Sequence, residues 1–238
     1  MGKSTTCVNL TCALYEAKQK SLLVDFDPQG NATSGMGVDK NAAPSVYDMV
    51  IDGVAADRCL VHTRYGDIIP ANKSLSGAEV ELVDRARREY LLADALRDVA
   101  DRYDYVIIDC PPSLGLLTLN ALCAARTVLV PVQCEYYALE GLSDLMYTIR
   151  AVKTKLNPTL DIEGLLLTMF DGRTNLSLQV AAEVKRHFPG KLYAAVIPRN
   201  VRLSEAPSHG MPVLHYDRYS KGCDAYVQLA AEVIQRNK

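Results

Sequence analysis

Apolar and polar residues alternate along the chain in two patterns, short continuous apolar runs and longer stretches with apolar residues three or four positions apart. The runs Ser21–Asp25 and Tyr105–Asp109 are typical of strands buried on both faces of a parallel sheet. The stretch Ser4–Lys18 has helical spacing and begins with hydroxyl residues that can cap a helix. Strands separated by helices of this length pair through right-handed crossovers, which predicts an α/β fold with a doubly wound, mostly parallel sheet flanked by helices.

Predicted helices and strands alternate along the rest of the chain as well. We expect further helices near 46–51, 77–83, 89–102, after 114, and at 139–155, 176–188 and 221–236, and further strands near 67–70, 127–132, 163–170 and 193–197, with an edge strand near 213–215. Neither a linker rich in Pro, Ser or Gly nor an internal repeat divides the sequence. We therefore interpret residues 1–238 as one domain.

The first residues, Met1-Gly2-Lys3-Ser4-Thr5-Thr6, match the second half of a phosphate-binding loop of the form G-x-x-x-x-G-K-[ST]. In that loop, backbone N–H groups surround the phosphates, the lysine reaches the β and γ oxygens, and the hydroxyl binds Mg²⁺. The following helix points its N-terminus, which favours anions, at the same place. Gly-Lys-Ser also occurs at ordinary capped helix starts, so the interpretation depends on acidic residues later in the chain.

Carboxylates follow two of the predicted strands. Asp27 comes just after the first apolar run and Asp109 ends the second. Ligands of parallel sheets bind beyond the carboxyl ends of the strands, so both acids are expected beside the Lys3-Ser4 loop. The alternative is that Asp25 and Asp27 only shape a turn.

Together these residues predict a site for phosphoryl transfer. Lys3 is expected to neutralise the β and γ phosphates, and Ser4 to bind Mg²⁺. Asp109 holds the metal, directly or through its water shell, and Asp27 orients the attacking water. Placement and charge neutralisation suffice for slow hydrolysis, which suits a switch better than a metabolic enzyme.

Composition and charge limit the classes of protein to which the chain can belong. The chain has a net charge of −2 and 49% hydrophobic residues, as a globular protein does. Between Phe170 and Lys221, eight basic residues face four acidic ones, a local balance of +4, so the remainder carries −6. The seven cysteines have no C-x-x-C spacing and are interpreted as buried, reduced thiols of a cytosolic protein. Polar residues and a proline interrupt the longest apolar region, 115–132, which excludes it as a membrane span.

Several long motifs carry a resemblance to a known family. They are Lys3-Ser4-Thr5-Thr6 with Val8-Asn9-Leu10, then the segments 24–35 (VDFDPQGNATSG), 109–115 (DCPPSLG), 131–142 (PVQCEYYALEGL) and 197–208 (IPRNVRLSEAPS). On these segments, which are spread over essentially the whole chain, the protein resembles the ParA/Soj family of partitioning ATPases, in particular its chromosomal Soj-like branch.

The resemblance implies a P-loop NTPase of the SIMIBI type that binds ATP and Mg²⁺ and forms a nucleotide-sandwich homodimer. It also implies a cytoplasmic, nucleoid-associated protein that binds DNA without sequence preference and hydrolyses ATP under stimulation by a ParB/Spo0J-type partner, for chromosome or plasmid partitioning. By the same resemblance, the site residues are Lys3 and Asp27 for catalysis; Gly2, Lys3, Ser4, Thr5, Pro198, Arg199 and Asn200 for the nucleotide; Ser4 and Asp109 for the metal; and Arg173 and Arg202 for DNA.

The family begins with an apolar strand and a Lys-Gly-Gly-Val-Gly-Lys-Ser loop, whereas this sequence starts with Met1 at the position of the loop's valine. We expect that the first strand and the first half of the loop are missing because the start was assigned one motif too late. The missing strand would lie in the middle of the sheet, so the chain as written is expected to fold poorly. The alternatives are a truncated paralogue and a disrupted gene.

Three other classes of protein compete with this interpretation. A membrane-bound relative of the MinD kind needs an amphipathic C-terminal helix, but residues 226–238 have the pattern of a helix packed on a core, so no membrane partner is expected. An iron–sulfur carrier needs paired interface cysteines, which are not evident in Cys110 or Cys123. A truncated, non-hydrolysing paralogue that binds DNA or a partner remains the alternative function.

Overall fold

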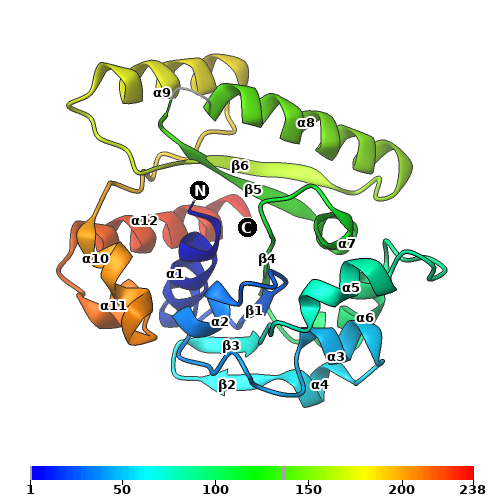
Figure 1. The fold of residues 1–238 in the computed structure, drawn as a ribbon. Coiled ribbons are helices and arrows are strands. Elements are labelled where there is room, and N and C mark those ends of the chain that lie inside the picture. The colour runs from blue at the N-terminus through cyan, green and yellow to red at the C-terminus, as the bar shows by residue number, and fades with distance from the viewer. Residues whose placement is uncertain (1, 136–137) are drawn as a thin grey trace.

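The computed structural model describes residues 2–135 and 138–238, and its strands form two sheets (Figure 1). The first sheet has the order β2-β3-β1-β4 and the second pairs β5 with β6. All pairs are parallel except the β2–β3 hairpin, which confirms the predicted α/β fold with a mostly parallel arrangement. The strands are β1 Ser21–Asp25, β2 Val61–Thr63, β3 Gly66–Ile69, β4 Tyr105–Asp109, β5 Thr127–Gln133 and β6 Asp161–Thr168.

Helices surround both sheets and alternate with most of the strands along the chain. They are α1 Lys3–Glu16, α2 Asn31–Gly35, α3 Val46–Ile51, α4 Ala56–Cys59, α5 Leu75–Glu81, α6 Leu91–Ala100, α7 Leu116–Ala124, α8 Ala138–Lys155, α9 Asn175–His187, α10 Val201–Glu205, α11 Val213–Tyr216 and α12 Lys221–Arg236, with a 3₁₀ turn η1 Ala206–His209. Tyr136 and Tyr137, which belong to one of the family motifs, lie outside the described residues.

The first sheet is covered on both faces, as its continuous apolar strands predict. Leu22 and Val24 pack with α3 to α7, whereas Leu23 between them packs against α1, and all three are fully buried. Alternate residues of a strand point to opposite faces, so every position of β1 is in a core. Each such side chain contributes roughly 1.5–3 kcal/mol relative to an exposed position.

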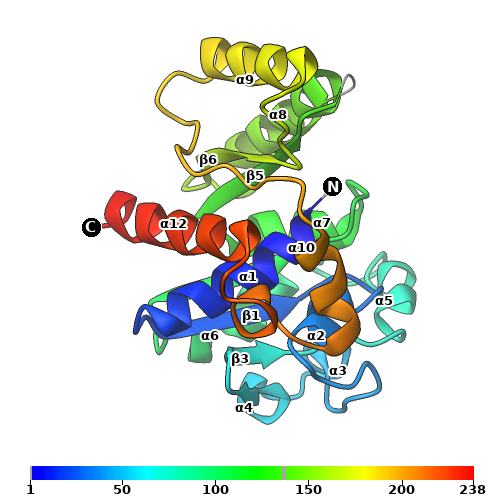
Figure 2. The same ribbon diagram turned by 90° about the vertical axis from the view of Figure 1, so that its left-hand side faces the viewer.

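The second sheet has helices of its own. Residues of α8 and α9 form one apolar cluster with β5 and β6. Figures 1 and 2 place these two helices at the opposite end of the molecule from α3 and α4. The closing helix α12 packs against α1, where Tyr226 and Leu229 meet Leu10 and Leu14.

The strand predicted at 193–197 is wrong in detail. The segment does run beside β6, since Tyr193 N donates to Leu165 O at 2.9 Å and Ile197 N donates to Leu167 O at 2.9 Å. Only isolated bridges form, however, at Leu192 and Pro198.

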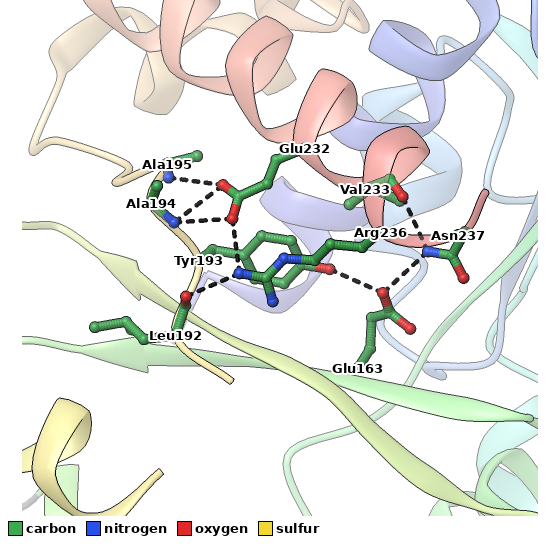
Figure 3. A network of polar contacts seen from close by, with 9 residues as sticks. All are labelled: Glu163, Leu192, Tyr193, Ala194, Ala195, Glu232, Val233, Arg236 and Asn237. Carbon is green, nitrogen blue, oxygen red and sulfur yellow. Dashed lines mark hydrogen bonds and ion pairs between the residues drawn. The ribbon is translucent and has the colours of Figure 1, made fainter. Parts of the chain in front are cut away.

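The interruption comes from helix α12. The Glu232 carboxylate accepts the N–H groups of Ala194 and Ala195 at 3.0 Å and so replaces the neighbouring strand as their partner (Figure 3). Arg236 holds this carboxylate at 2.7 Å and lies over the Tyr193 ring, 4.0 Å from its centroid. A charged side chain therefore ties the last helix to the edge of the second sheet.

The edge strand predicted at 213–215 is also wrong, because Val213 begins the short helix α11 after Pro212. Asn9 of α1 accepts the Val213 N–H at 2.7 Å, a contact between residues 204 positions apart. Sequence patterns also missed the short strand β2, whose three residues alternate too briefly to be recognised.

Candidate active site

The N-terminus of α1 lies at one end of the sheets. Gly2 precedes the helix in the left-handed conformation, with φ 94°, and its carbonyl accepts the Thr6 N–H at 2.9 Å. A Cβ on Gly2 would lie 3.5 Å from the hydroxyl of Thr168, which ends β6. Lys3, Ser4 and Thr5 form the first turn, which contains no acidic residue. An unopposed helix N-terminus of this kind favours an anion.

Asp109 and Asp25 end adjacent parallel strands and are register partners. Both side chains are fully buried. The Asp109 Oδ1 accepts a hydrogen bond from the Cys7 thiol at 3.6 Å, whereas Oδ2 is buried without a partner among the described residues. Burial raises the pKa of Asp109 to about 7, which the Ser4 hydroxyl opposes and the charge of Asp25 reinforces. Ser4 and the Asp109 oxygens therefore lie together at this end of the sheet.

Asp27 lies in the loop that follows β1 and is 6% exposed. Its Oδ1 accepts the Gln29 N–H at 2.9 Å, and its carbonyl accepts the Gly30 N–H at 2.9 Å. Gly30 has φ 60° and turns the chain into α2. The charges of both Asp25 and Asp27 raise the pKa of Asp109, less than burial does. The structure thus brings Asp27 close to Asp109, as the sequence predicted.

Asp25 holds the Asp27 loop at both ends. Its Oδ1 accepts the Asp27 N–H at 3.2 Å, and its Oδ2 accepts the Thr33 N–H at 2.7 Å and the Thr33 hydroxyl at 2.6 Å. The Thr33 Oγ1 accepts in turn the Ala71 N–H at 2.9 Å. Burial raises the pKa of Asp25, and the Thr33 and Asp27 hydrogen bonds oppose the rise. The sequence placed Asp25 correctly at the end of the strand 21–25, with a role in a turn as the alternative. It did not predict the link through Thr33, because Ala71 lies 38 residues further along the chain.

Residues 198–200 reach the same end of the molecule by a different route. Pro198 forms a bridge with Phe170, two residues beyond the end of β6, and Arg199 N donates to Phe170 O at 3.3 Å. The Arg199 guanidinium lies 4.0 Å from the Glu135 carboxylate, just past β5. Asn200 caps α10 by accepting the Arg202 N–H at 2.8 Å. The segment therefore borders the end of β6 that Gly2 contacts.

The two arginines predicted to bind DNA are exposed but engaged. Arg173 makes a two-pronged contact with Asp171, at 2.9 Å and 2.8 Å, and holds the pKa of that carboxyl down at about 2. Arg202 lies 2.8 Å from Glu205 and 3.1 Å from Asp217. Within the described residues, ion pairs are absent for three other basic residues of the region 170–221, namely Lys185, Arg218 and Lys221.

The donor atoms suit a magnesium-bound triphosphate. Mg²⁺ prefers oxygen ligands and keeps water and phosphate oxygens in its shell. The Ser4 hydroxyl and the unpartnered Asp109 Oδ2 supply such oxygens, and Lys3 at the start of α1 supplies positive charge. Among residues 2–135 and 138–238, His, Cys, Asp and Glu side chains form no cluster of three that could hold a metal unaided. The arrangement therefore fits a metal whose remaining ligands come from phosphate and water.

The structure also describes the state of the cysteines and the character of the helices, both of which the sequence predicted. The seven cysteines are free thiols, and burial raises the pKa of every one of them, to about 12 for Cys12 and Cys110. Across the described part of the chain, no helix is both long enough and apolar enough to cross a bilayer.

Comparisons with known proteins identify the family to which this chain is similar. A family model described as an AAA domain matches residues 1–162. The chain is 52% identical over 240 residues to the chromosome partitioning protein ParA of Myxococcus xanthus, covering 100% of this chain and 85% of that protein. It is 55% identical to the sporulation initiation inhibitor protein Soj of Bacillus subtilis, over 98% of this chain and 93% of the relative. Among solved structures, cobyrinic acid a,c-diamide synthase of Mycobacterium smegmatis with bound ADP and magnesium superposes with a TM-score of 0.85 at 39% identity, covering 98% of this chain and 89% of that one.

Proposed function

Because this chain belongs to the ParA/Soj family of chromosome-partitioning ATPases, we propose that it is an ATP-dependent dimerising switch that binds DNA without sequence preference. It is an ATPase, and its cofactors are ATP and Mg²⁺. In the proposed cycle, a ParB/Spo0J-type partner stimulates slow hydrolysis, and the protein acts on the nucleoid in the cytoplasm. The proposal rests mainly on the positions of Ser4, Asp27 and Asp109, which lie together beside the N-terminus of α1.

Each site residue has a role that its surroundings support. Lys3 and the N–H groups of the first turn bind the β and γ phosphates. Ser4 and the Asp109 carboxylate hold the metal, which when bound neutralises charge on the phosphate oxygens. Asp27 orients the attacking water, since its buried carboxylate is fixed by the Gln29 N–H on a loop beside Asp109.

The nucleotide and the DNA are assigned to different parts of the surface. Gly2 and Thr5 contribute backbone groups to the phosphates, and the segment Pro198–Asn200 forms the wall beside the adenine. Arg173 and Arg202, in the basic region 170–221, contact DNA phosphates. Contacts of this kind depend steeply on salt and hardly on base sequence.

One experiment with two variants separates the steps. Light scattering with and without ATP measures dimerisation, and co-sedimentation measures DNA binding. The wild type is expected to dimerise and bind DNA only with ATP. Lys3→Ala loses both properties because the phosphates lose their cation, whereas Arg202→Glu keeps ATP binding and dimerisation and loses DNA. An unchanged DNA co-sedimentation of Arg202→Glu refutes the DNA assignment, and ATP-independent behaviour of the wild type identifies a passive binder.

A further inference from the structure

We propose that Cys7 is a positioning residue of the metal site, whose thiol holds one oxygen of Asp109 and so presents the other oxygen to Mg²⁺. This inference rests on the proposed function, in which Ser4 and Asp109 bind the metal. Cys7 lies between the motif segments 3–6 and 8–10, so neither the sequence motifs nor the proposed function gives it a role.

The two oxygens of the Asp109 carboxylate have different surroundings. The Cys7 thiol donates to Oδ1 at 3.6 Å, whereas Oδ2 is buried without a hydrogen-bond partner among the described residues. The side chain as a whole is fully buried at the end of β4. Because a buried oxygen without a donor is costly and Mg²⁺ prefers oxygen ligands, Oδ2 is the oxygen that suits the metal. The thiol occupies the other oxygen and leaves this one free.

Helix α1 places the thiol and the metal-binding hydroxyl on the same side. Ser4 and Cys7 are three positions apart in α1, and residues at that spacing are neighbours on a helix surface. Burial raises the pKa of Asp109, and hydrogen bonds from both Ser4 and Cys7 oppose the rise, so both side chains reach this carboxyl. The Gly2 carbonyl accepts the Thr6 N–H at 2.9 Å and fixes the turn between them. One turn of helix therefore sets where Asp109 lies relative to the phosphates.

Two other thiols of the chain show that the contact is particular to Cys7. Cys110 follows Asp109 directly, but its thiol is directed to the Ile108 carbonyl at 3.7 Å. Cys12 lies further along α1, is fully buried, and makes no hydrogen bond within the part of the chain that the structure describes. Burial, and after it the charge of Asp109, raises the pKa of Cys7 well above its ordinary value, so the sulfur keeps the proton that it donates.

The size of the effect follows from the strength of the donor. Partners that orient a metal ligand commonly change metal affinity by about 10–100-fold when they are removed. A thiol is a weak donor, so we expect about a fivefold loss when Cys7 is replaced by alanine. Serine keeps a donor at the same position and should restore most of that loss.

The first test measures how much Mg²⁺ strengthens ADP binding. Calorimetry gives the ADP affinity with Mg²⁺ and with EDTA, and the ratio of the two is the metal-dependent gain. The gain is expected to fall about fivefold in Cys7→Ala and to stay within about twofold of the wild type in Cys7→Ser. ADP affinity in EDTA should be the same in all of these proteins. Cys12→Ala and Cys110→Ala are the controls and should keep the full gain.

The outcomes separate this inference from the proposed function. An unchanged gain in Cys7→Ala overturns the positioning role and leaves the proposed metal site intact. An equal loss of affinity with Mg²⁺ and with EDTA also overturns it, because it shows general damage to the nucleotide site. A wild type whose ADP affinity does not respond to Mg²⁺ refutes the proposed metal site, and the role of Cys7 with it.

A second measurement tests the hydrogen bond without nucleotide or metal. The infrared spectrum of the wild type minus that of Cys7→Ala isolates the S–H stretching band of Cys7, and the same subtraction with Cys12→Ala isolates that of Cys12. A donated hydrogen bond weakens the S–H bond, so the Cys7 band is expected at the lower frequency. Bands at the same frequency would show that Cys7 does not hold Asp109.

Discussion

The carboxylates at the end of the first sheet and the arginines of the region 170–221 are both proposed to meet phosphates or their metal, yet they are built in opposite ways. Asp25 and Asp109 are fully buried and Asp27 is 6% exposed. The Arg173 side chain is 90% exposed and that of Arg202 is 51% exposed. Asp25 and Asp27 are held by backbone N–H groups and Thr33, and Asp109 by the Cys7 thiol. The two arginine side chains are held instead by neighbouring surface carboxylates.

The contrast shows that burial determines how strongly a charged side chain interacts with its surroundings. Charges in a buried site are little screened, so removing or moving one has a large effect on the reaction. Exposed charges in salt interact over about 8–10 Å, and a surface ion pair contributes little to stability. We therefore expect substitutions at the acids to change rate or folding strongly, and substitutions around the arginines to change DNA affinity by smaller, salt-dependent factors.

The largest effect is expected from Asp27→Asn. The amide keeps the shape of the side chain but cannot accept a proton from the attacking water, so ATP turnover should fall by about a hundredfold or more. Nucleotide affinity, measured by calorimetry with Mg²⁺, should change little. Asp52→Asn, at an exposed position just after α3, is the control and should retain full turnover. Turnover of Asp27→Asn close to the wild-type value would remove Asp27 from the mechanism.

A smaller effect, on folding, is expected from Thr33→Val. Valine has nearly the same volume, but it removes the donor to Asp25 and the acceptor of the Ala71 N–H, both in a buried place. The expected loss is about 2 kcal/mol of unfolding free energy, measured with urea. Because Asp25 also fixes the Asp27 N–H, ATP turnover should fall as well.

The chain offers a matched control for that substitution. Thr11 is also fully buried, but its hydroxyl has no hydrogen-bond partner within the described part of the chain. Thr11→Val should therefore be neutral or slightly stabilising, since it replaces an unpaired polar group by a methyl group. Equal losses in Thr11→Val and Thr33→Val would mean that packing, and not the link from Asp25 to Ala71, is what Thr33 contributes.

The contrast between the buried acids and the exposed arginines also explains which parts of the structure could be predicted from the sequence. The strands ending in Asp25 and Asp109 were predictable because each contains a continuous apolar run, 22–24 and 105–108, and such a run is stable in the middle of a parallel sheet. The place of Asp27 follows from the chain, since a residue just beyond a strand lies at its carboxyl end.

Partners that are distant along the chain were not predictable. Glu232 replaces a strand for Ala194 and Ala195, and Asn9 caps the turn at Val213, because tertiary packing brings these polar groups together. Local patterns carry no signal for such contacts, which explains the wrong strands at 193–197 and 213–215. For the same reason, the sequence showed an excess of basic residues but not which of them carboxylates already hold.

The smallest effect, and the sharpest test of the contrast, is expected from Glu205→Gln. Glu205 lies 2.8 Å from the Arg202 guanidinium. This hydrogen bond lowers the pKa of the Glu205 carboxyl, and the carboxylate competes with DNA phosphates for the arginine. Glutamine removes that competing charge and leaves Asp217, 3.1 Å from the same guanidinium, as the remaining acidic partner, so the release of Arg202 is partial. DNA affinity, measured by fluorescence anisotropy on a random duplex with ATP present, should rise roughly two- to fivefold at low salt and less at high salt. Glu183→Gln removes the partner of Arg186 on α9 and serves as the control for net charge alone. If both variants gain affinity equally, overall charge and not release of Arg202 explains the gain, and if neither gains, the exposed pairs do not restrain the arginines at all.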